Sequence, residues 1–416
     1  MTLQGRSSSP FTDSKGAAGM THALFTHIRP HGGDPHDVLV TDGRIAAVDP
    51  ATRPGNCVVV DGGGALALPS LVDAHIHPDK SAWGRPWLSR EPADTLRELI
   101  TNDVATQRAM TSPVHERAGA LIARAVGRGT RAMRAHVDVA PVHGLSHLHG
   151  IRAAAAPFAS AMDLQVVAFP QLGLLTEPGT AELLEQAVKE GADIVGGLDP
   201  IGIDGDLDGH LDVLFGIAER TGAPIDIHLH DRGRAGLDQI SEIARRTLAA
   251  GMRGKVTISH AFCLSDCDAT ELERTAEFLA DADVAVTTCA LGSEPVVPFR
   301  PLVERGVRVG AGSDGVRDAW TPFGDGDMFT RAHLLAYRTD ARTDEELAAC
   351  YAVAAHGGAD VMGLERSDLR IGDPADFVLL AGESVAQVLV DRPLPAMVVR
   401  AGNVVARDGR LERTTR

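Results

Sequence analysis

Two histidines, two residues apart, end a short apolar run near the start of the chain. Leu71, Val72 and Ala74 lead to His75 and His77 within residues 68–80. Side chains of a strand alternate between its faces, so residues two apart point the same way. Such a pair at a strand end can bind one metal ion, for example Zn²⁺ or Fe²⁺. A strand-capping histidine beside a core histidine is the alternative explanation.

Four other apolar segments also end in polar side chains. These are a second H-x-H pair with an acid behind it, a lone histidine, an aspartate and an amide: His228, His230, Asp231, His260, Asp314 and Gln171. Three or four imidazoles and a carboxylate can enclose one divalent ion and leave a position for water. The ion lowers the pKa of that water to about 7, and a nearby carboxylate can pass its proton to a leaving nitrogen. Each residue alone could be structural, but the repetition favours a metal site.

Strands that alternate with helical segments can bring these positions together. Eight candidate strands cover residues 71–77, 134–139, 164–169, 193–196, 224–228, 255–260, 284–288 and 307–311. The amphipathic segments cover residues 92–105, 180–189, 210–220, 237–250, 269–279, 327–337 and 344–356. The alternation predicts an α/β fold, a (β/α)8 TIM barrel with its chemistry at the carboxyl ends of the strands. An open doubly wound sheet is the alternative, but its Gly-rich phosphate turn is missing.

Short strands separated by turns occupy both ends of the chain. Segments 37–41 and 44–48 flank Asp42-Gly43, a strong hairpin signal, and further strands cover residues 375–380, 396–400 and 403–406. We expect residues 21–68 and 366–412 to form one small β-sandwich domain, and residues 69–365 to form the barrel. Residues 1–20 are rich in Ser, Gly, Thr and Pro and are predicted to be disordered.

The composition argues against several classes of partner. A net charge of −16 disfavours nucleic acid and anionic membranes, which both need a positive surface. Five scattered cysteines form no disulfide framework and suit a reducing cytosol. The sequence contains no stretch of about 20 apolar residues and no secretory signal. We therefore expect a cytoplasmic protein that acts on a small molecule.

The motifs together resemble the amidohydrolase superfamily, and within it the branch of the cytosine deaminases and N-isopropylammelide isopropylaminohydrolases. The stretches that carry the resemblance are residues 69–77, 134–139, 166–171, 225–228, 257–260, 312–314, 318–320 and 372–378. The resemblance implies the barrel fold and one divalent ion, Zn²⁺ in preference to Fe²⁺ or Mn²⁺. It implies the ligands His75, His77, His228 and Asp314. Binuclear members carry a carboxylated lysine after the fourth strand, and residues 191–200 contain no lysine.

The resemblance also implies roles for residues beside the ion. His260 stabilises the developing tetrahedral centre, and Gln171 contacts the substrate ring. Deaminases of this branch carry a glutamate where this chain has Asp231, one methylene shorter, so either Asp231 or His230 is the proton shuttle. The substrate-contacting aspartate that follows the last ligand in cytosine deaminase is Gly315 here.

These differences predict that the chemistry is kept and that the substrate is not cytosine. We expect a hydrolase that deaminates a small nitrogen-rich heterocycle. An amidase, or an N-dealkylating enzyme, acting on a cyclic or open-chain amide is the alternative, and a non-catalytic ligand-binding barrel is a more distant one. A homo-oligomer is also expected, because oligomers are common in this family.

Further residues lie close to these motifs. We expect Lys80 to pair with a substrate carboxylate or with Asp79, and Trp320 to stack on a planar ring. We expect the histidines at 143, 147 and 149 to lie in a solvated loop. His136 and Asp138 are predicted to support the metal ligands.

Overall fold

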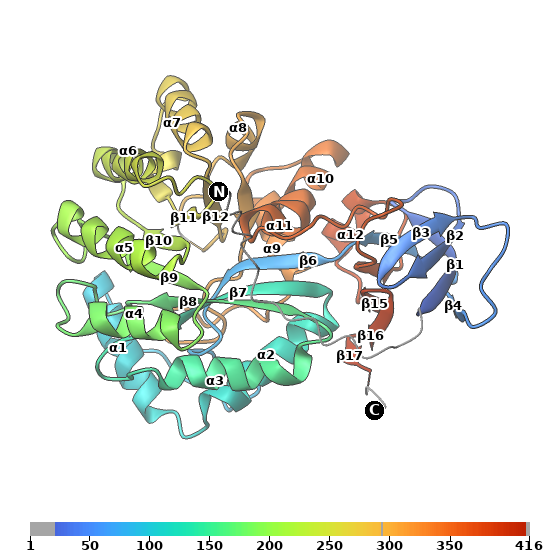
Figure 1. The fold of residues 1–416 in the computed structure, drawn as a ribbon, viewed down its shortest axis with the longest axis horizontal. Coiled ribbons are helices and arrows are strands. Elements are labelled where there is room, and N and C mark those ends of the chain that lie inside the picture. The colour runs from blue at the N-terminus through green and yellow to red at the C-terminus, as the bar shows by residue number, and fades with distance from the viewer. Residues whose placement is uncertain (1–20, 293, 413–416) are drawn as a thin grey trace, which may run out of the picture.

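An eight-stranded parallel sheet forms a barrel at the centre of the molecule (Figure 1). The computed structural model describes residues 21–292 and 294–412, so the predicted disorder of residues 1–20 lies outside the described residues. The barrel strands are β6 (Leu71–Ile76), β7 (Thr130–Asp138), β8 (Asp163–Phe169), β9 (Ile194–Leu198), β10 (Ile225–Leu229), β11 (Val256–His260), β12 (Val284–Thr288) and β13 (Val309–Ala311). Each pairs in parallel with the next. The predicted (β/α)8 fold is confirmed.

The first and last barrel strands meet at their carboxyl ends. The backbone N–H of Asp314 donates to the carbonyl of His75 at 2.8 Å, and Ile76 forms a parallel bridge with Asp314. Gly312 permits this approach, because a Cβ at that position would lie 2.5 Å from the carbonyl oxygen of His75. The seam therefore places His75 and Asp314 next to each other.

Helices surround the barrel. They are α1 (Leu96–Ala109), α2 (Val114–Gly127), α3 (Ser146–Ala155), α4 (Thr180–Lys189), α5 (Leu207–Thr221), α6 (Gly233–Ala249), α7 (Ala269–Asp281), α8 (Phe299–Glu304), α9 (Met328–Arg338), α10 (Asp344–Ala352), α11 (Gly358–Val361) and α12 (Val385–Asp391). The seven predicted helical segments correspond to α1, α4 to α7, α9 and α10. Helices α2, α3, α8, α11 and α12 were not predicted. Every helix within the described residues is too short or too polar to cross a membrane.

The helices bury apolar stripes against the strands. In α6, for example, Leu237, Ile240, Ile243 and Ala244 recur at helical spacing and are buried. Its polar face carries Arg245, which pairs with Glu242 on the surface. The burial of the apolar face, rather than intrinsic propensity, holds such a helix in place. The loops between strand and helix are thereby fixed at the carboxyl end of the barrel.

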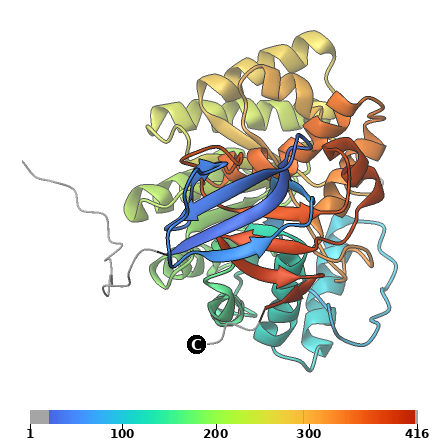
Figure 2. The same ribbon diagram turned by 90° about the vertical axis from the view of Figure 1, so that its right-hand side faces the viewer.

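A second sheet combines strands from both ends of the chain (Figure 2). It consists of β1 (His22–Pro30), β2 (His36–Thr41), β3 (Arg44–Val48), β4 (Val58–Asp61), β5 (Leu66–Pro69), β14 (Phe377–Leu380), β15 (Met397–Arg400), β16 (Asn403–Arg407) and β17 (Arg410–Leu411). The hairpin at Asp42-Gly43 forms as predicted, with φ of 48° and 78°. β5 pairs antiparallel with β14 and leads into β6, so this sheet holds the start of the barrel. The exact domain boundaries stay a prediction.

Candidate active site

Four predicted ligands converge at the carboxyl ends of β6, β10 and β13. The Nε2 atoms of His77 and His228 lie 3.3 Å apart. Oδ1 of Asp314 lies 3.4 Å from Nε2 of His77 and 3.6 Å from Nε2 of His75. Donor atoms around a tetrahedral ion with bonds of about 2.0–2.1 Å are separated by about 3.4 Å. The spacing therefore fits a single small divalent cation.

The protonation states of these groups also suit a metal. Burial, reinforced by the charge of Lys80, lowers the pKa of His77 to about 4. Burial likewise holds the pKa of His228 well below its usual value. Burial opposes ionisation of Asp314, but its contacts with His75 and His77 keep its pKa well below the usual range. Near neutral pH His77 and His228 are thus neutral and Asp314 is a carboxylate, the forms that bind metal.

A hydrogen-bonded chain orients His75. Oγ of Ser259 donates to Oδ1 of Asp226 at 2.7 Å, so it accepts from Nδ1–H of His75 at 3.0 Å. Arg134 balances the charge of Asp226 at 2.9 Å. The proton of His75 is therefore on Nδ1, and its buried Nε2 has no hydrogen-bond partner among the described residues. A bound ion would satisfy this lone pair, which is costly to bury alone.

Left-handed backbone occurs at two strand ends of the site. His260, at the end of β11, has φ of 70°, and Asp314, just beyond β13, has φ of 59°. Such values are uncommon for residues other than glycine, and they concentrate at functional sites. The sharp turns direct both side chains inward at the mouth of the barrel.

A cavity lies next to the ligand cluster. Its lining consists of His77, Lys80, Leu96, Phe169, Gln171, Leu198, His228, His230, His260, Asp314, Gly315, Asp318 and Trp320. Within it the ring of His230 stacks on that of His260, with centroids 4.4 Å apart. The cavity therefore gathers every predicted substrate-binding residue, namely Gln171, Lys80, His230 and Trp320.

The two stacked histidines, His230 and His260, differ in the direction of their pKa shifts. Burial lowers the pKa of both, but Nδ1 of His230 lies 2.7 Å from a carboxylate oxygen of Asp199, and that partner raises the pKa of His230 overall. Burial, followed by the charge of His230, keeps the pKa of His260 well below its ordinary value. His230 is therefore the readier proton donor, while His260 stays neutral.

Asp231 is the predicted site residue that the structure does not bring to the cavity. Its Oδ2 accepts hydrogen bonds from the backbone of Gly202 at 3.0 Å and from Nε2 of Gln239 at 2.8 Å. The reason is local, because β10 ends at Leu229 and Asp231 lies in the turn to α6, where its carboxylate faces Gly202 and Gln239. Of the two predicted proton shuttles, His230 has access to the cavity.

Lys80 has partners that the sequence reasoning missed. Its Nζ lies 3.0 Å from Oδ1 of Asp138 and 3.5 Å from Oδ2 of Asp103. Asp79, its expected partner, instead contacts Nδ1 of His147 at 2.9 Å. His147 is buried in α3, so the prediction of a solvated loop is wrong for this residue. His149 lies in the same helix, although it is exposed as predicted. Asp138 pairs with Lys80 rather than with a metal ligand.

Asp318 is a further cavity residue without a predicted role. Burial raises the pKa of its carboxyl to about 7. Its Oδ1 accepts from the backbone N–H groups of Trp320 and Thr321, which fixes the loop that carries the indole. A Cβ at Gly315 would lie 2.5 Å from Oδ2 of Asp318, which accounts for the missing side chain there. The sequence feature that could have indicated a role for Asp318 is the motif Asp318-Ala-Trp320.

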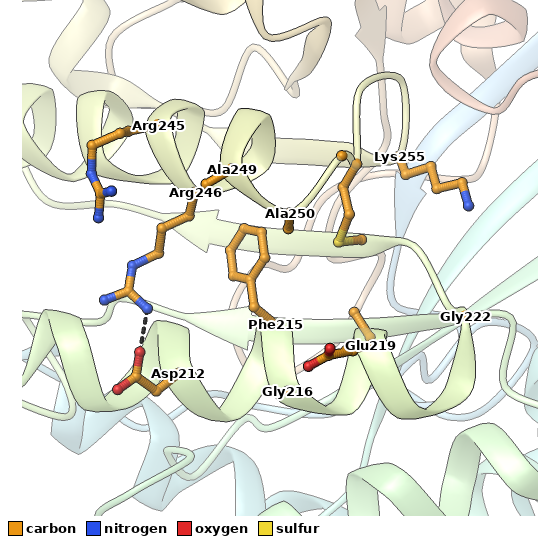
Figure 3. Close-up of a pocket in the computed structure, with 13 residues that line it drawn as sticks. Asp212, Phe215, Gly216, Glu219, Gly222, Arg245, Arg246, Ala249, Ala250 and Lys255 are labelled. Carbon is orange, nitrogen blue, oxygen red and sulfur yellow. Dashed lines mark hydrogen bonds and ion pairs between the residues drawn. The ribbon is translucent and has the colours of Figure 1, made fainter.

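A larger groove lies outside the barrel, between α5 and α6 (Figure 3). Arg246 pairs with Asp212 across it, and Phe215 and Met252 form its apolar part. Lys255 lines the groove and immediately precedes β11. The groove therefore lies at the amino ends of the strands, opposite the ligand cluster. The described residues that line it include no histidine or cysteine, so the barrel mouth is the candidate active site.

Known proteins resemble this chain along most of its length. Residues 89–406 match the amidohydrolase family. The solved structure of N-isopropylammelide isopropylaminohydrolase from Burkholderia multivorans has a TM-score of 0.90 and 40% identity, covering 94% of this chain and 100% of that chain. N-isopropylammelide isopropyl amidohydrolase of Pseudomonas sp. strain ADP is 29% identical over 90% of this chain and 94% of its own length. Pterin deaminase of Rhizobium rhizogenes is 26% identical, over 89% and 88% respectively.

Proposed function

Since the chain belongs to the amidohydrolase family of metal-dependent hydrolases, we propose that it replaces an amino or alkylamino group of a small nitrogen heterocycle by oxygen. The convergence of three imidazoles and a carboxylate beside a cavity carries this proposal. The name of the Burkholderia relative, an isopropylaminohydrolase acting on N-isopropylammelide, supports an amine as leaving group. The name of the Rhizobium relative describes a deaminase.

The residues proposed to hold the ion are His75, His77, His228 and Asp314. One divalent ion is expected, Zn²⁺ in preference to Fe²⁺ or Mn²⁺, although all three accept such ligands. When bound, the ion lowers the pKa of a coordinated water and so supplies hydroxide near neutral pH. The buried lone pair of His75 and the depressed pKa of Asp314 support this assignment.

The remaining chemistry consists of proton transfers and charge stabilisation by the chain. Asp314, ionised before the reaction, accepts a proton from the attacking water at a carboxylate oxygen. Nε2 of His230, opposite the nitrogen that Asp199 holds, donates to the leaving nitrogen. His260 stays neutral and stabilises the negative charge that develops at the tetrahedral carbon. Each role matches the charge state that its surroundings impose.

The substrate wall is proposed to combine amide, cationic and aromatic groups. Gln171 and Lys80 line the cavity together with the rings of Trp320 and Phe169, and we expect Trp320 to stack on a planar substrate ring. An amidase acting on a cyclic or open-chain amide uses the same ion and remains the second candidate, because Gly315 removes an acidic substrate contact. A non-catalytic barrel would not need the ordered hydrogen bonds behind His75.

Product analysis tests the proposal. The purified protein, with its metal content measured, is incubated with amino- and alkylamino-substituted triazines, pterins and pyrimidines, and released ammonia or amine is assayed. Asp314→Asn should unfold at a similar temperature to wild type and lose turnover by about a hundredfold or more. Asp212→Asn, in the groove outside the barrel, is the matched control and should keep full activity.

Three outcomes would contradict parts of the proposal. Wild-type turnover in Asp314→Asn would refute the assigned ligand and base. A carboxylic acid product without ammonia or amine would favour the amidase. Substoichiometric metal that added Zn²⁺ or Fe²⁺ does not restore would favour a non-catalytic barrel.

We also propose a cytoplasmic location and a small-molecule substrate rather than nucleic acid or a membrane. All five cysteines are free, which suits a reducing compartment. The net charge of −16 gives no general attraction for polyanions. Fractionation of cells that express a tagged chain tests the location.

A further inference from the structure

Lys80 is a buried cation in the wall of the proposed substrate cavity. Its side chain is 2% exposed, and carboxylates of Asp138 and Asp103 lie 3.0 and 3.5 Å from Nζ. Charged and titratable groups surround it. They are Asp79 on its own loop, His77 after β6, Asp103 from α1, Asp138 from β7, His143 after β7, His147 from α3 and Asp318 from the loop after β13. The positive charge of Lys80 is therefore balanced within the protein.

Lys80 also fixes the orientation of Gln171. Its Nζ donates to Oε1 of Gln171. An ammonium group has donors only, so the amide atom that faces it must be the oxygen. Nε2 of Gln171 then lies on the other side of the amide, and it makes no hydrogen bond to any described residue. Because Gln171 lines the cavity, this N–H group is available to a ligand.

We propose that Lys80 acts on the substrate through Gln171, and that the pair selects a ring whose facing edge presents a hydrogen-bond acceptor. The acceptor is a carbonyl oxygen or an unprotonated ring nitrogen of an uncharged heterocycle. Lys80 is thus a positioning residue, and Gln171 makes the contact. This inference rests on the proposed function and specifies its substrate class.

Asp138 and Asp103 keep Lys80 protonated, and so keep the amide of Gln171 in one orientation. Burial alone favours a neutral lysine, but the two carboxylates reverse that preference and raise the pKa of Lys80 above its usual value. A neutral amine could accept as well as donate a hydrogen bond, and the amide of Gln171 could then rotate. The buried carboxylates therefore secure the donor that faces the substrate.

Gln171→Glu is the direct test, on the metal-loaded enzyme with a substrate from the panel above. The new carboxylate still pairs with Lys80 and keeps the shape, but it offers no N–H to the ring. We expect kcat/KM to fall by about a hundredfold, mainly through KM, without loss of thermal stability. Lys80→Met, which frees the amide, should lower kcat/KM by about tenfold or more.

Asp138→Asn tests the charge argument through the pH profile. Lys80 loses its nearer carboxylate, so its pKa should fall. The value of kcat/KM should then show a further decline at alkaline pH, beyond the decline from deprotonation of His230 that the variant shares with the wild type. Asp163→Asn, which breaks a pair with Arg400 outside the cavity, is the control and should keep the wild-type profile.

A comparison on the wild-type enzyme keeps the test independent of folding defects. A hydroxy-triazine should inhibit about tenfold more strongly than an analogue whose facing edge carries only C–H groups, with neither a carbonyl oxygen nor an unprotonated ring nitrogen. Absence of turnover on every heterocycle would refute the proposed function itself. With turnover present, wild-type kcat/KM in Gln171→Glu, an unchanged profile in Asp138→Asn, or equal inhibition by both rings would overturn the inference.

Discussion

Ser259→Ala isolates the hydrogen bond that orients His75, a proposed metal ligand. The serine hydroxyl joins Nδ1 of His75 at 3.0 Å to Oδ1 of Asp226 at 2.7 Å, and Thr287 contacts the same oxygen at 3.0 Å. Alanine removes all three bonds and leaves the buried Nδ1 and carboxylate oxygen without that partner. The proton of His75 is then free to move to Nε2, the nitrogen that faces the ion.

The size of the effect follows from what is lost. An unsatisfied buried polar group costs about 1–3 kcal/mol, so the free energy of unfolding of the metal-free protein should fall by at least that amount. Groups that orient metal ligands are worth about 10–100-fold in affinity, or about 1.4–2.7 kcal/mol. Both effects should be measured, affinity by competition with a chelating dye and stability by denaturant unfolding of the metal-free protein.

Thr257→Val provides a matched control on the same strand and the same face. Its buried hydroxyl accepts from Arg134 at 3.0 Å and does not contact His75. We expect it to lose stability while it keeps wild-type metal affinity. If both variants, or neither, bind the metal more weakly, the role assigned to Ser259 is refuted.

Two further predictions concern a buried ion pair and the proton shuttle. Burial opposes the charge of His147, but its bond with Asp79 raises its pKa, so its contribution to stability is full below its unfolded pKa and disappears as pH rises through the folded value. His147→Gln should therefore lower the unfolding free energy more at about pH 5.5 than at about pH 9; equal losses in the two unfolding curves would contradict this. Asp231→Asn should leave kcat/KM within about twofold of wild type, whereas His230→Gln should lower it by about a hundredfold or more. The opposite ranking in steady-state assays would restore Asp231 as the shuttle.

The barrel and its ligand cluster could be predicted because both depend on local patterns. Strand alternation makes His75 and His77 point the same way, and parallel strands bring their carboxyl ends to one mouth. The choice of His228 and Asp314 as the other ligands came from the family resemblance. The family resemblance inferred from these motifs is confirmed by the match over residues 89–406. The role of Asp231 was predicted from the family resemblance alone, and strand alternation, which puts His228 and His230 on one face, places Asp231 on the other.

The partners of Lys80 could not be found in this way. Asp103 is buried in α1 and Asp138 ends β7, and neither sequence position indicates which side chain it faces. An acidic residue in a predicted helix is usually assigned to the solvent-exposed face. The helix that contains His147 escaped prediction because histidines and a glycine interrupt its apolar pattern between residues 146 and 150.

Below the proposed ligands, the barrel interior contains a buried ion pair that orients His75 instead of apolar side chains that only fill space. Arg134 on β7 contacts Asp226 on β10 at 2.9 Å, and these strands are not neighbours, so the pair must cross the interior. Branched apolar side chains usually fill that space, and a buried ion pair brings little or no net stability compared with them. Here Asp226 accepts a hydrogen bond from Ser259, which in turn contacts His75. The free-energy cost of burying the pair is therefore accompanied by a fixed orientation of the imidazole. That arrangement has a use only if something binds to the free nitrogen of His75.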